Sequence, residues 1–113
     1  MTGILSLIPV VILSGASLSD VAFLNGQTPC MILMPAAWTA ADICFLGSNN
    51  GVNHHYIYDT LGVLVSMITG ASHRLILTQT VFAHHVSMKI LSGTPTVPVA
   101  QGDDRTIYLE VWS

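Results

Sequence analysis

Turn-forming residues recur along this 113-residue chain at short intervals, and that spacing limits the possible folds more than any other feature. A spacing of roughly 8 to 12 residues between turns is typical of a β-sandwich or barrel. No segment of useful length has the period of a helix. The turn signals are Ser14-Gly15, Asn25-Gly26, Ser48-Asn49-Asn50-Gly51, Leu61-Gly62, Thr69-Gly70, Ser92-Gly93-Thr94-Pro95 and Gln101-Gly102-Asp103-Asp104. We expect a single all-β domain over residues 1–113, an antiparallel β-sandwich.

The last strand has the clearest pattern. Segment 106–112 alternates as a half-buried strand does. Ile107, Leu109 and Val111 share one face, and Tyr108, Glu110 and Trp112 share the other. The pattern predicts a strand with one face in the core.

The apolar run over residues 4–13 is predicted to be an edge strand. It contains Pro9, which lacks a backbone N–H, followed by three β-branched residues. The run also resembles the apolar part of a signal peptide, although no Lys or Arg precedes it. Ten residues are too few to cross a bilayer. The edge strand is our interpretation, and the signal peptide is the alternative.

Asn50-Gly51 is the strongest hairpin signal in the chain, because both residues tolerate the positive φ angles of a type I′ turn. It predicts a turn that joins strands over 42–48 and 52–59. A second reversal at residues 60–62 would return the chain through a third strand over 63–68. These strands would form a meander. One helical turn is expected over 78–83, where there is neither alternation nor a breaker.

Charged residues are scarce. Lys and Arg total 3, Asp and Glu total 6, and the charged fraction is 8%, whereas about 25% is typical. Hydrophobic residues make up 51% of the chain, so its surface must include apolar groups that partner proteins would cover. Three fixed cations form no basic stripe, and we therefore expect no nucleic-acid binding.

Histidines are the most obvious candidates for chemistry, at His54, His55, His73, His84 and His85. Neighbours on a regular strand point to opposite faces, so an adjacent pair cannot bind one ion together. A metal held by one member of each pair is the remaining alternative. The chain has no Gly-x-Ser-x-Gly elbow and no phosphate loop. We expect no enzymatic activity, no cofactor and no metal.

Both cysteines, Cys30 and Cys44, lie in apolar runs where a free thiol behaves as a small hydrophobe. We expect two buried thiols and no disulfide. Around the second cysteine, Ile43 and Phe45 should share a strand face, with Cys44 on the opposite one.

Aromatic residues supply the candidate contact sites. Tyr108 and Trp112 are predicted interface residues, because aromatic side chains are enriched where proteins meet. Tyr56 and Tyr58, followed by Asp59, form a second cluster that could contact a partner or a sugar.

Several stretches resemble a family of small structural proteins encoded in the virion gene blocks of tailed bacteriophages and prophages. They are Ser14-Gly15-Ala16-Ser17-Leu18-Ser19, Met34-Pro35-Ala36-Ala37-Trp38-Thr39-Ala40-Ala41, Asn50-Gly51 with Tyr58-Asp59 and Gly62, and Lys89-Ile90, Ser92-Gly93-Thr94, Pro98-Val99, Gln101 and Arg105. The chain departs from the family pattern at His54 and His55, where a tyrosine-rich patch is common, and at Leu91, where a basic residue is common.

The resemblance implies a jelly-roll-like sandwich that decorates or cements the capsid. Such proteins bridge coat subunits, often as trimers at local symmetry axes. We expect this chain to form a homo-oligomer, with a trimer favoured. It implies the major capsid protein or other virion proteins as partners, a place on the head exterior and synthesis in the host cytoplasm. No membrane partner is expected. The alternative is a carbohydrate- or receptor-binding module of a tail or fibre, because sandwiches also carry sugar sites on their loops.

Overall fold

The computed structural model describes residues 5–77 and 85–112, and strands are the regular structure in those ranges. The strands are β1 (Leu5–Ile12), β2 (Ala22–Phe23), β3 (Thr28–Leu33), β4 (Ile43–Ser48), β5 (His55–Tyr56), β6 (Ser66–Met67), β7 (Arg74–Ile76), β8 (Ser87–Ser92) and β9 (Arg105–Trp112). No helix that could span a membrane is found in the described part of the chain. The helical turn expected over 78–83 lies outside the described residues.

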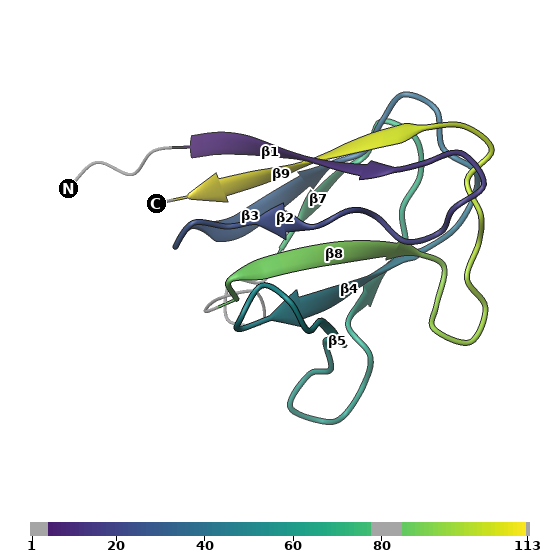
Figure 1. Ribbon diagram of the computed structural model, residues 1–113. Coiled ribbons are helices and arrows are strands. Elements are labelled where there is room, and N and C mark those ends of the chain that lie inside the picture. The colour runs from purple at the N-terminus through teal and green to yellow at the C-terminus, as the bar shows by residue number, and fades with distance from the viewer. Residues whose placement is uncertain (1–4, 78–84, 113) are drawn as a thin grey trace.

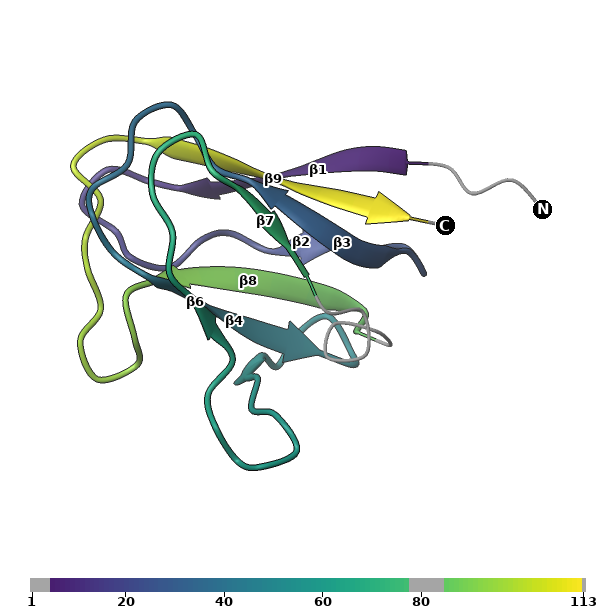
Figure 2. The same cartoon turned by 180° about the vertical axis from the view of Figure 1, so that it is seen from behind.

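The strands form two sheets that pack face to face (Figures 1 and 2). The first sheet has the order β1-β9-β3-β7, and the second has the order β2-β8-β4-β5, with β6 also paired to β4. Every pairing between named strands is antiparallel. This is the strand order of a jelly roll, with β5 and β6 together in the place of one strand, because both pair with β4 at different points along its length. The expected antiparallel, jelly-roll-like β-sandwich is confirmed.

The core lies between the sheets and follows the strand alternation. Ile107, Leu109 and Val111 of β9 are fully buried, whereas Tyr108 and Trp112 are exposed. The alternation predicted for the last strand is therefore confirmed. The main core also contains Val10, Ile12, Ala22, Leu24, Ile32, Met34, Ile43, Phe45, Ile57, Leu77, Met88 and Ile90.

β1 lies at the edge of the first sheet, as Pro9 predicted. The N–H of Val11 donates to Oδ1 of Asp20 at 2.9 Å, and its carbonyl accepts from the N–H of Asp20 at 3.0 Å. The backbone groups of Val11 therefore point away from β9. Those of Pro9, two residues earlier, point the same way. The missing N–H of Pro9 thus costs no ladder bond.

The hairpin predicted at Asn50-Gly51 forms, since β4 pairs with β5 on either side of it, but its turn and register are not those of a type I′ turn. Oγ of Ser48 accepts from the N–H groups of Asn50 and Gly51. Oδ1 of Asn50 accepts from the N–H groups of Val52 and Asn53. Of the two turn residues, Gly51 has a positive φ and Asn50 does not, so the turn is not type I′. These bonds hold a wider loop, which places His55 opposite Gly47. A two-residue turn would have placed His54 there.

The one-residue shift moves the side chains of β5 to opposite faces. Tyr56 now lies opposite Leu46 and packs on a small cluster on the outside of the second sheet. That cluster consists of Cys44, Leu46 and Leu91, all buried. Cys44 therefore faces away from the main core, as predicted, and is nevertheless covered.

The predicted three-stranded meander is correct in part: the chain reverses at residues 60–62 and Tyr58 forms an antiparallel bridge with Leu64, but the third strand does not stay beside β5. β6 returns to β4, the strand that β5 also pairs with, through Met67 opposite Ile43. Between them, residues 57–65 leave the sheet as the loop below β5 in Figure 1. Asp59 closes this loop, because its Oδ1 accepts from the N–H groups of Leu61 and Val63 at 2.9 Å. The return to β4 lets Met67 pack against the main core.

Gln101 joins the loops at one end of the sandwich. It is 1% exposed, and its Oε1 accepts from the N–H of Thr39 at 2.9 Å and from Nε of Arg105 at 3.2 Å. Its Nε2 donates to the carbonyl of Thr39 at 3.1 Å and to Oγ of Ser92 at 2.8 Å. Its backbone bonds to Gly15 and Ala16. Through its side chain and backbone, Gln101 thereby links the loop after β1, the loop between β3 and β4 and its own loop to the end of β8.

Replacing Gln101 with Leu should lower the free energy of unfolding by at least about 2 kcal/mol. Leucine has a similar volume, but it leaves the polar groups of Thr39, Ser92 and Arg105 without their hydrogen-bond partner. Urea denaturation measures this change. Gln27→Leu, at a half-buried glutamine before β3, is the matched control and should change stability by less than about 0.5 kcal/mol. Equal stability of the two variants would contradict the role of Gln101.

Candidate functional site

The most distinctive surface is the outer face of the first sheet, which points away from the core. The register places its side chains in rows across four strands. We call this surface the outer face; its residues are Leu5, Leu7, Met31, Leu33, Arg74, Ile76, Tyr108, Glu110 and Trp112.

Large apolar side chains on the outer face are open to solvent. Ile76 is 75% exposed, Leu5 53%, Leu7 52%, Trp112 45% and Tyr108 40%. Their exposed parts together come to roughly 500 Å², within the range of about 300–600 Å² for the largest apolar patch of a typical monomer. Four of them lie on the neighbouring strands β1 and β9, and Ile76 lies in the same row as Leu7, beyond Glu110 and Met31. Together they form one surface suited to contact with another protein.

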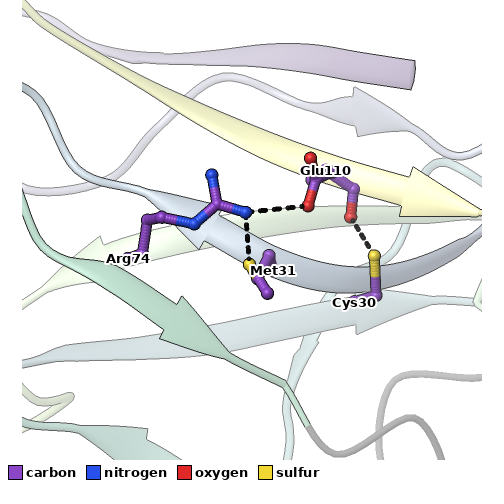
Figure 3. Close-up of polar contacts among 4 residues, drawn as sticks. All are labelled: Cys30, Met31, Arg74 and Glu110. Carbon is purple, nitrogen blue, oxygen red and sulfur yellow. Dashed lines mark hydrogen bonds and ion pairs between the residues drawn. The ribbon is translucent and has the colours of Figure 1, made fainter. Parts of the chain in front are cut away.

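One ion pair lies within this apolar surface (Figure 3). Arg74 reaches across β3, and its Nη2 donates to Oε2 of Glu110 at 3.4 Å and to Sδ of Met31 at 2.8 Å. It is the one ion pair found among residues 5–77 and 85–112. The Arg74 side chain is 58% exposed and that of Glu110 is 17% exposed. The outer face therefore presents one cation and one anion surrounded by apolar groups.

Cys30 lies beside this ion pair. It falls in a β-bulge between Pro29 and Met31, and its Sγ donates to the carbonyl of Glu110 at 3.2 Å (Figure 3). Burial raises the pKa of the Cys30 thiol, and the Glu110 carboxylate raises it further. The thiol is therefore protonated at neutral pH and lacks the activation of a nucleophile.

The structure separates the two predicted aromatic pairs. Tyr108 and Trp112 both lie on the outer face, whereas Tyr56 and Tyr58 belong to the second sheet and its loop. Tyr56 packs on the cluster around Cys44, and Tyr58 is 55% exposed. Oδ1 of the neighbouring Asp59 is already bonded within its own loop. Of this second aromatic pair, Tyr58 is therefore the exposed member, next to Asp59.

Sequence reasoning missed six members of the outer face: Leu5, Leu7, Met31, Leu33, Arg74 and Ile76. The alternation of the first apolar run contained a signal for Leu5 and Leu7, since residues 5, 7 and 9 share a face. Nothing in the short segment 74–76 indicated that it would join the same sheet. That contact depends on the register of β7 against β3.

Three of the described histidines lie near the end of β4. Nε2 of His54 lies 2.8 Å from Oγ of Ser87, His55 lies opposite Gly47, and the His85 ring packs over Gly47. The ring of His73 lies beside Gly70, in the loop before β7. His84 lies outside the described residues. Within the described ranges, no group of three or more His, Cys, Asp or Glu side chains is placed to hold a metal ion.

A shallow hollow of about 270 Å³ lies beside the end of β1. Val11, Leu13, Ala16 and Leu18 form its apolar lining, and Asp20 lies at its margin. The Asp20 carboxylate already accepts the N–H of Val11. The hollow therefore lacks the several convergent polar groups that orient a bound small molecule.

The two thiols should react in a fixed order. Burial raises the pKa of Cys44 to about 11, and the side chain is fully buried, so iodoacetamide should modify it in unfolded protein or at strongly alkaline pH. Cys30, which is half-buried, should react first at pH 8. Intact mass spectrometry of wild type and of Cys30→Ser and Cys44→Ser assigns each adduct. A two-proton mass deficit without reductant, or faster labelling of Cys44, would contradict this order.

Comparison of the chain with protein-family models, with curated proteins and with solved structures finds no match. The site is therefore interpreted from its geometry and chemistry.

Proposed function

We propose that this chain is a structural protein of a tailed bacteriophage virion that decorates the capsid and stabilises it through protein–protein contacts. The observation that carries the proposal is the outer face, where five large apolar side chains lie exposed around one ion pair. Removing such a surface from water is worth roughly 25 cal/mol for each Å² of apolar area. A protein of this kind works by contact area and shape, without catalysis.

The two sheets differ in a way that supports this proposal. On the outside of the second sheet, the loop over residues 57–65 covers the apolar cluster around Cys44. On the outside of the first sheet, Leu5, Leu7 and Ile76 have no comparable cover from the described part of the chain. The fold thus protects one apolar face and leaves the other available to a partner.

The partners on this proposal are the major capsid protein or other virion proteins, together with further copies of the chain. The family resemblance adds the head exterior as the location and local symmetry axes as the binding sites. Nucleic acid and membrane are not proposed as partners, because three Lys and Arg residues supply too little positive charge for either. The jelly roll supports the proposal weakly, since coat proteins and lectins share that architecture.

Purified particles should contain this chain at hundreds of copies, because a decoration protein follows the symmetry of the shell. Quantitative mass spectrometry against the major capsid protein gives the copy number. A few tens of copies at most would favour the tail or fibre alternative.

Trp112→Ala should weaken binding to the particle by about 2 kcal/mol or more, because exposed aromatic anchors contribute strongly to interfaces. Occupancy on particles that lack the wild-type protein measures this loss. Tyr58→Ala removes a similarly exposed aromatic side chain from the other sheet and is the control. A larger loss of occupancy in the control would place the contact on the loop of the second sheet.

A further inference from the structure

We propose that the outer face binds a second copy of this chain, sheet against sheet about a two-fold axis, with Arg74 of each copy pairing with Glu110 of the other. This inference rests on the proposed function in one respect: it names the partner of the same surface. The contact is isologous, because both copies use the same residues. It therefore closes with two copies, whereas the family resemblance implies trimers.

The charges on the outer face are self-complementary. Arg74 uses Nη2 for its bonds to both Met31 and Glu110, and a guanidinium carries five N–H donors, so donors are left for a second carboxylate. Glu110 accepts from Arg74 through Oε2, and its Oε1 can accept another bond. A partner for this face must offer one carboxylate and one cation among apolar groups. A second copy, rotated by 180°, offers both at matching positions.

The size of the outer face suits such a contact. Strands of eight, eight, six and three residues, at about 3.3 Å per residue and about 4.8 Å apart, give a footprint of roughly 400 Å² in projection. Specific interfaces begin at about 600 Å² of accessible surface per partner, which includes the relief of the side chains. Because that relief makes the accessible area larger than the projected area, the face lies at the lower limit for a specific dimer, with Tyr108 and Trp112 as aromatic anchors.

Sheet stacking also brings the charges within reach of each other. Stacked sheets lie about 10 Å apart, with their side chains interdigitated. A long arginine side chain spans much of that gap, and Arg74 is 58% exposed on the side that the second copy would cover. Closure would bury Leu5, Leu7 and Ile76, three of the large apolar side chains that the described fold leaves exposed.

Charge reversal provides a specific test. Arg74→Glu makes the outer face doubly negative at this point, and Glu110→Arg makes it doubly positive. We expect sedimentation velocity to show wild type as a dimer at micromolar concentrations, with each single variant dissociating about tenfold or more readily, since like charges repel across the contact. An equimolar mixture of the two variants should associate as tightly as wild type, because opposite charges again face each other.

Control variants separate this contact from effects on folding. Lys89→Glu reverses a charge on β8 of the second sheet and should leave dimerisation unchanged. Ile76→Ser removes the most exposed apolar residue of the outer face and should also weaken dimerisation about tenfold. Ile68→Ser, at an isoleucine that is 84% exposed away from the outer face, should have no effect. Circular dichroism confirms that each variant is folded.

Two results would overturn the inference: a wild-type chain that stays monomeric at roughly 1 mM, well above typical dissociation constants of specific complexes, or a mixture of variants no tighter than either variant alone. Binding to particles is scored separately. A monomeric chain that still decorates particles would mean that the coat protein occupies this face, which removes the dimer and keeps the proposed function. A chain that dimerises but is absent from particles would keep the dimer and remove the proposed function.

Discussion

The buried amide of Gln101 is the interaction on which the arrangement of the two sheets depends most. A jelly roll repeatedly passes its chain between sheets, so its loops must be fixed at the ends of the sandwich. Gln101 satisfies both polar ends of its side chain with Thr39, Ser92 and Arg105 and bonds through its backbone to the loop after β1. Polar groups buried at this depth are costly unless all of them are paired. Their full pairing specifies which loops meet.

The low charge of the chain becomes intelligible once the two faces of each sheet are compared. In β4 all six residues are buried, because the main core covers one side, and Tyr56 of β5 and Leu64 of the following loop cover the other. In β9 the inner residues are buried and the outer ones are exposed. A chain with 8% charged residues cannot cover both outer surfaces with charge. It covers one surface with its own loop and leaves the other apolar.

The outer face therefore connects structure to the proposed function. Its apolar groups supply contact area, whereas Arg74 and Glu110 supply direction, because charge pairs contribute more to specificity than to affinity. Cys30 lies next to this pair, yet its raised pKa keeps the thiol neutral and consistent with a structural role. The proposed capsid contact and the proposed two-fold dimer both use this surface, so the two partners would compete for it. Particle occupancy and sedimentation report on the two contacts separately.

The sequence by itself determined the strand character of the chain, the buried face of the last strand and the edge position of the first. These features depend on local chemistry: the two-residue alternation of side chains, the missing N–H of Pro9 and the spacing of turn residues. Tyr108 and Trp112 were predicted as neighbours on one face for the same reason. Only the tertiary structure decided the register at Asn50-Gly51, the return of β6 to β4 and the approach of Arg74 to Glu110. Those outcomes depend on competing hydrogen bonds and on packing between segments far apart in the chain, and no local pattern encodes them.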